Sequence, residues 1–167
     1  MHEYPKMPGL IPLGLADTLM LRDYLDKYPR ENCDYTITNL IVWGQIYQNQ
    51  YLMFKDRLVF FNPQYQYILH PVGEDLQPHE LVELVKLFKP YYPEAELILT
   101  PQEYIDKHPE MGSLFELVND RDWADYVYDI DKMVNLSGKK LAKKKNLISQ
   151  FRRAYPQYKV MKITEDR

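Results

Sequence analysis

Three strand-like runs follow one another within residues 50–71, and their spacing constrains the fold more than any other feature. The runs "QYLMFK" (50–55), "LVFFN" (58–62) and "YQYILHP" (65–71) are rich in Tyr, Phe, Ile and Val, which favour strands. Only two residues separate each run from the next. Parallel neighbours need a crossover of about a dozen residues or more, so connections this short predict antiparallel pairing.

Helical patterns flank these strands. Apolar residues recur at spacings of three and four in segments 15–28, 33–48 and 77–92, which predicts amphipathic helices. The other expected elements are strands at 8–15, 95–100, 113–120, 125–130 and 157–164, and helices at 101–108 and 136–156. This order predicts an α/β (α+β) fold, with a central mixed but mostly antiparallel sheet flanked by helices.

Charge is divided unevenly along the chain. Residues 1–135 carry 11 Lys and Arg against 22 Asp and Glu, whereas residues 136–167 carry 10 against 2. The overall net charge of −3 therefore hides local values of −11 and +8. Such a division indicates an anionic partner for the basic end, or an electrostatic contact between the two parts.

The basic end contains a dense group of cations on an expected helix. We consider these side chains candidate anion-binding residues: Lys139, Lys140, Lys143, Lys144, Lys145, Arg152 and Arg153. The apolar residues Leu141, Ile148, Phe151 and Tyr155 fall on one stripe of that helix, and we expect this stripe to pack against the core. Two interpretations stay open: a packed helix with a solvated lysine face, or a surface that binds an anion.

Two segments resemble a known family. They are "DYTITNLIVW" (34–43) and "DYVYDIDKMVNLSGKKLAKKKNLISQF" (125–151), and they are similar to the phosphatidylglycerol lysyltransferase C-terminal-like family. The resemblance implies a tandem GNAT-like acyltransferase fold, of which this chain resembles the first half. We expect residues 1–135 to form the first GNAT-like domain. Residues 136–167 would be the basic helix and strand that begin an incomplete second half.

The resemblance also implies a donor and partners. In a complete two-half protein the donor would be acyl-CoA or aminoacyl-tRNA. The partners implied are tRNA or an anionic phospholipid head group, and either a homodimer or the missing second half. The first half is not expected to hold its own CoA. Its loop "HPVGEDLQP" has a single glycine, Gly73, while Pro71 and Pro78 lack N–H donors, and Glu74 and Asp75 would repel a pyrophosphate.

Other candidate site residues carry less weight. Asp34, Tyr35 and Asn39 are groove candidates from the first matching segment; the alternative is that Asp34 caps a helix and Trp43 lies in the core. Tyr104 is the one catalytic candidate, because a tyrosine near this place can act as general acid in GNAT enzymes. Neither the histidines nor the acidic segment 119–131 shows metal-ligand spacing, so no metal site is expected.

Compartment and function class follow from simpler features. A single cysteine, Cys33, permits no disulfide within the chain, and no apolar run approaches the ~18 residues that a membrane span needs. We therefore expect a cytoplasmic protein without a transmembrane segment, with peripheral membrane contact left open. The leading hypothesis is a domain of an acyl- or aminoacyl-transferase, and the alternative is a non-catalytic binding or dimerisation module.

Overall fold

The computed structural model describes residues 4–162. It divides into two compact units, of which the first ends at Trp123 and the second begins at Ala124. We call them unit 1 and unit 2 and describe each by itself. The division expected from the family pattern, between residues 135 and 136, concerned the two GNAT-like halves and stays a prediction.

Unit 1 is built on a five-stranded sheet whose strands lie in chain order. The strands are β1 (Ile11–Pro12), β2 (Gln50–Phe54), β3 (Arg57–Asn62), β4 (Tyr67–Leu69) and β5 (Glu96–Ile98). Neighbours from β1 to β4 pair antiparallel, and β5 pairs parallel to β4. The predicted antiparallel pairing of the three central runs is confirmed, as is the mixed, mostly antiparallel sheet.

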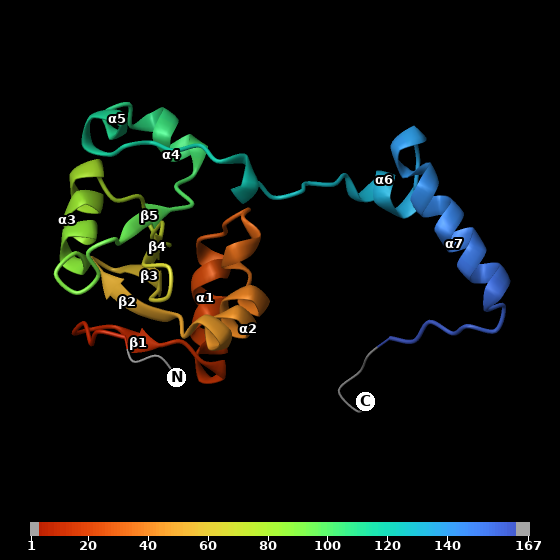
Figure 1. Ribbon diagram of the computed structural model, residues 1–167, viewed down its shortest axis with the longest axis horizontal. Coiled ribbons are helices and arrows are strands. Elements are labelled where there is room, and N and C mark those ends of the chain that lie inside the picture. Colours follow the sequence, from red (N-terminus) through yellow and green to blue (C-terminus); the bar gives the residue numbers. More distant parts are fainter. Residues whose placement is uncertain (1–3, 163–167) are drawn as a thin grey trace. The chain divides into compact units, whose positions relative to one another are not determined.

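Helices cover both faces of the sheet (Figure 1). The larger ones are α1 (Thr18–Lys27), α2 (Ile37–Tyr47) and α3 (Pro78–Phe88). Side chains of β3 alternate between two cores: Leu58 and Phe60 pack with α1 and α2, whereas Val59 and Phe61 pack with α3. All four side chains are nearly inaccessible to solvent, so β3 is buried on both faces of the sheet, which explains its continuous apolar sequence. The mixed α/β class with flanking helices is thus established.

Shorter elements complete unit 1. They are η1 (Leu15–Asp17), η2 (Cys33–Tyr35), α4 (Gln102–Lys107), α5 (Met111–Leu114) and η3 (Arg121–Trp123). A third apolar cluster joins Leu76, Leu81, Tyr104 and Met111, and it holds α4 and α5 against the end of α3. The sheet and its helices thereby leave the polar and aromatic ends of β3, β4 and α2 to form the site described below.

Two expected strands are wrong. Segment 113–120 begins inside α5 and then runs without regular structure, and segment 125–129 is likewise irregular before the next helix begins at Ile130. A strand must pair its backbone groups with a neighbour, and these segments have none among residues 4–162. Their β-favouring side chains are accordingly exposed, Val118 by 80% and Val127 by 93%. Residues 157–162 form no strand either, and the rest of the strand expected at 157–164 lies outside the described residues.

Unit 2 consists of helices: α6 (Ile130–Asn135), η4 (Lys139–Leu141) and α7 (Ala142–Ala154). Asp129 begins α6, because its carboxylate accepts a hydrogen bond from the Lys132 backbone N–H at 2.9 Å. Positive φ angles at Leu136 (48°) and Gly138 (92°) turn the chain before η4. The basic helix is confirmed, with its regular α-helical part beginning at Ala142.

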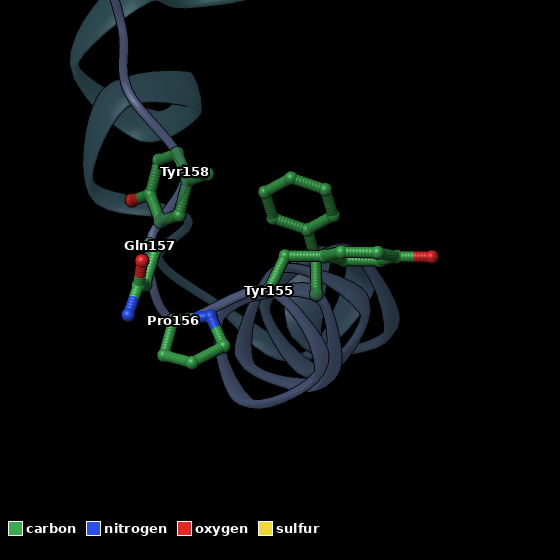
Figure 2. A pocket seen from close by; sticks show the side chains of 5 residues that line it. Tyr155, Pro156, Gln157 and Tyr158 are labelled. Carbon is green, nitrogen blue, oxygen red and sulfur yellow. The ribbon is translucent and has the colours of Figure 1, made fainter.

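The apolar stripe of α7 differs from expectation. Ile148, Phe151 and Tyr155 are exposed by 40%, 48% and 62%, so the expected packing of the stripe in a core does not occur within unit 2. The stripe makes local contacts instead. The Phe151 ring lies 5.1 Å from Tyr155 and 5.2 Å from Tyr158, and with Pro156 and Gln157 they line an open hollow of about 380 Å³ (Figure 2).

Candidate functional site

A groove of about 420 Å³ opens on unit 1 beside α2 and the ends of β3, β4 and β5. We call it the aromatic groove. It is lined by Asp34, Asn39, Leu40, Trp43, Tyr47, Asn49, Asn62, Tyr65, Tyr67, Leu69, Ile98, Leu99 and Trp123. The segment from Asp34 to Asn49 supplies six of these residues, and Trp123 comes from η3. The other six lie on or next to β3, β4 and β5, whose pairing brings them to one part of the sheet.

Five aromatic rings follow one another around this groove. Trp43 stacks on Tyr47 at 5.8 Å, Tyr47 meets Tyr65 at 5.8 Å, Tyr65 stacks on Tyr67 at 5.7 Å, and Tyr67 meets Trp123 at 5.5 Å. The first and third pairs are nearly parallel, at 19°, whereas the second and fourth are inclined by 64° and 78°. The rings therefore present π faces from sharply different directions. Trp43, expected in the core, is instead 47% exposed on this groove.

Polar groups of the groove are positioned by the backbone around them. The Asn39 side-chain amide donates to the Cys33 carbonyl at 2.9 Å, and the Asn62 side-chain oxygen accepts from the backbone N–H groups of Gln64 and Tyr65. Asn49 differs, because its side-chain oxygen is buried and has no hydrogen-bond partner among the described residues. A buried acceptor without a partner is costly, so it is a place where a ligand donor would stabilise the protein.

The three groove candidates separate in the structure. Asp34 and Asn39 line the aromatic groove, whereas Tyr35 is buried in the core between the sheet and α2. The Tyr35 hydroxyl donates to the His70 carbonyl at 2.9 Å, and burial raises the pKa of the phenol well above its ordinary value. Tyr35 is thus placed to hold the sheet to η2. Thr36, and not Asp34, caps α2, through a hydrogen bond from the Asn39 backbone N–H.

Tyr104 lies in a second group of buried side chains. Its ring is 4.8 Å from His70 and 4.5 Å from His108, and its hydroxyl donates to the Leu76 carbonyl at 2.7 Å. Tyr104 is 2% exposed, and burial, with nearby carboxylates, raises its pKa to about 12. These contacts describe a packing role, and catalysis by Tyr104 stays a prediction.

The N-terminus of α3 follows the loop in which an acyl-CoA pyrophosphate would be sought. Here the Glu80 carboxylate accepts a hydrogen bond from the Gln77 backbone N–H at 2.8 Å, which closes a capping box. That hydrogen bond, with Lys55 at 3.0 Å, holds the pKa of Glu80 below its ordinary value. The helix end that an anion would use is therefore engaged by the chain's own carboxylate.

The seven candidate anion-binding residues all lie in unit 2, between Lys139 and Arg153. Each is exposed, and none forms an ion pair within residues 4–162. Lys140 and Lys144 are four residues apart, as are Lys139 and Lys143, so like charges lie near each other along the helix. Such an arrangement is mildly unfavourable until an anion neutralises it.

Sequence reasoning did not identify the aromatic groove as a whole. It named Asp34 and Asn39, but Tyr47, Tyr65 and Trp123 are far apart in the sequence and carry no shared motif. The one available signal was the high tyrosine content, 15 of 167 residues, which suggests amphipathic surface without locating it.

Within the described part of the chain, no three His, Cys, Asp or Glu side chains gather as metal ligands would. Over the same residues, no helix is both long enough and apolar enough to cross a bilayer.

The sequence matches a known protein family, and the fold matches a solved structure. A family model described as "Phosphatidylglycerol lysyltransferase, C-terminal" matches residues 25–167. The fold is similar to that of a solved conserved protein of unknown function from Bacteroides thetaiotaomicron VPI-5482, with a TM-score of 0.74 and 27% sequence identity. The match covers 96% of this chain and 55% of that one, so this chain spans about half the length of its structural relative. A comparison with curated proteins found no match. The family match extends over most of the sequence, and the chain therefore belongs to the phosphatidylglycerol lysyltransferase C-terminal family.

Proposed function

We propose that the chain is a GNAT-like domain of an acyl- or aminoacyl-transferase, and that its basic helix holds the phosphate groups of the donor or acceptor. The observation that carries the proposal is the set of seven exposed cations on η4 and α7, none of them engaged by a carboxylate within the described residues. Membership of the lysyltransferase family supports the reaction class. We place this activity in the cytoplasm, with transient attachment at a membrane surface.

Unit 1 serves a structural and substrate-shaping role in this proposal. Its α3 N-terminus is capped by Glu80, and the carboxylates of Glu74 and Asp75 precede it, so this half is poorly suited to a CoA pyrophosphate. A complete enzyme would take acyl-CoA or aminoacyl-tRNA elsewhere. Half the length of the structural relative has no counterpart here, and we propose that the corresponding second half supplies that site.

The phosphate chemistry sets the expected behaviour of the basic helix. Each phosphate neutralised by Lys or Arg releases counterions, so log K falls with log salt by ~0.9 per contact on duplex nucleic acid. If all seven cations contact phosphates, the slope of log K against log salt would be about −6, and fewer contacts would make it less steep. Arg152 and Arg153 can add bidentate contacts that lysines cannot make. A vesicle with anionic head groups would respond to salt in the same direction.

The test compares binding to tRNA, acyl-CoA and vesicles containing phosphatidylglycerol, over a range of salt concentrations. The variant Lys143→Gln/Lys144→Gln should make the slope of log K against log salt for tRNA less steep by about 2. Lys86→Gln/Lys107→Gln, which removes two exposed lysines from unit 1, is the matched control and should leave it unchanged. The three arms identify the source of the phosphate. Absence of salt-dependent binding in every arm, or equal losses in variant and control, would contradict the proposal.

A second candidate function is a non-catalytic dimerisation module. The exposed stripe of Ile148, Phe151 and Tyr155 supports it, because an apolar stripe without a partner in unit 2, beside strong positive charge, suits a second, acidic surface. Residues 1–135 of another copy carry that opposite charge. Light scattering at low and high salt separates the two functions: a salt-sensitive dimer with no phosphate affinity supports the module, and a monomer at every salt concentration rejects it.

A further inference from the structure

We propose that the aromatic groove binds an organic ammonium cation. All the residues of this site belong to unit 1, and it does not depend on the transferase proposal. Its parts are the five rings from Trp43 to Trp123, the Asp34 carboxylate and the unpartnered Asn49 oxygen. Each of these features favours positive charge over negative charge.

The rings supply the principal recognition. An ammonium group over the face of Trp or Tyr is attracted by the ring quadrupole, and Trp is the strongest of the aromatic side chains in this respect. Two nearly parallel pairs, Trp43–Tyr47 and Tyr65–Tyr67, are joined by a contact inclined at 64°. Ring faces from two such directions can surround a cation on several sides, which is how aromatic cages hold alkylated ammonium groups.

The polar residues favour the same ligand. Asp34 contributes a carboxylate to the lining, and no Lys, Arg or His is among the lining residues that the structure describes. Asn49 also lines the groove, and its buried side-chain oxygen, an acceptor without a partner among the described residues, favours a hydrogen-bond donor over an anion nearby. A free phosphate or carboxylate would meet the opposite arrangement, since the groove offers it no cationic partner.

The dimensions suit a small molecule. A volume of about 420 Å³ falls in the range of small-molecule pockets, and half-exposed Trp43, Tyr65 and Trp123 leave the rings accessible to solvent. A neutral sugar could also stack on such rings, so the discriminating property is charge. Choline and 3,3-dimethylbutan-1-ol make the comparison, because they share a shape and differ in that charge.

The chain offers a built-in reporter for this test. Its only two tryptophans, Trp43 and Trp123, both line the groove, so intrinsic tryptophan fluorescence reports on it directly. Choline chloride, titrated into the full chain against sodium chloride of equal ionic strength, should produce a saturable change. The neutral isostere should bind at least about fivefold more weakly. Equal affinity for the isostere, preference for glucose, or no saturable change with choline would each overturn the proposal.

Matched variants test the residues assigned to the site. Asp34→Asn should weaken choline binding about tenfold, whereas Asp26→Asn, which removes a carboxylate from the exposed side of α1, should not. Tyr65→Leu should weaken it several-fold, whereas Tyr91→Leu, at an exposed tyrosine outside the groove, should not. Far-ultraviolet circular dichroism checks that each variant is folded. Retained affinity in folded Asp34→Asn and Tyr65→Leu would also overturn the proposal.

Discussion

Lowering the pH from 7 to 5 should destabilise unit 1 through one buried imidazole, that of His70. Its side chain is 2% exposed, and its Nδ1 atom has no hydrogen-bond partner among residues 4–162. Burial, and secondarily the positive charge of Arg30, lowers the pKa of His70 from 6.5 to about 3. The folded chain therefore keeps this imidazole neutral at pH values where the unfolded chain protonates it.

The sign and size of the effect follow from this difference. Between pH 6.5 and pH 3 the unfolded state binds one more proton at His70 than the folded state. The free energy of unfolding therefore falls as the pH falls through that window, by up to about 1.4 kcal/mol per pH unit. From pH 7 to pH 5, His70 alone should remove about 2 kcal/mol. Ordinary carboxylates titrate mainly below this range, which makes it a favourable window for measurement.

Urea unfolding followed by circular dichroism at pH 5, 6 and 7 provides the assay. His70→Phe keeps an aromatic ring against Tyr104, whose ring centroid is 4.8 Å away, and removes the titrating group. This variant should lose about 2 kcal/mol less than the wild type between pH 7 and pH 5. His79→Gln, at an exposed histidine on α3, is the control and should behave like the wild type. If His70→Phe keeps the full pH dependence, the argument from burial is refuted.

Two further predictions concern the cores of unit 1. Phe61→Ala should lower the free energy of unfolding by about 3–5 kcal/mol, because Phe61 is fully buried and its ring centroid lies 4.7 Å from that of Phe88 and 4.6 Å from that of Tyr92. Urea titration measures this loss, and a loss under about 1 kcal/mol would contradict the prediction. Tyr104→Phe should lower the free energy of unfolding by about 1 kcal/mol, because it removes the hydrogen bond from the Tyr104 hydroxyl to the Leu76 carbonyl. The same urea titration measures this change, and an unchanged free energy would show that the hydrogen bond contributes nothing.

Sheet and helix assignments succeeded where the local pattern and the tertiary environment agree. The runs at 50–71 had strong β propensity and two-residue connections, and each found a strand beside it in the sheet. The pattern at 77–92 had an apolar stripe and Pro78 at its start, and α3 begins at that proline. In both cases short-range information was sufficient, because the neighbouring element follows directly in the chain.

Assignments failed where the outcome depended on a distant partner. Segments 113–120 and 125–130 have β-favouring residues such as Val118 and Val127, but no strand pairs with them in the described residues. The stripe through Phe151 has helical spacing and forms a helix, yet its apolar side chains stay exposed. Propensity and periodicity describe what a segment can form, and they do not tell whether a partner surface is present.

The sequence alone determined the antiparallel central strands, the helices around them, the charge division and the family to which the chain belongs. These depend on residue type and on spacing along the chain, which are local properties. Only the tertiary structure decided that Asp34 and Asn39 share a groove with five aromatic rings while Tyr35 is buried away from it. The reason is physical: β4 pairs with β3 from Tyr67 on, the turn before it places the Tyr65 ring 5.8 Å from Tyr47 at the end of α2, and no spacing in the sequence records that distance.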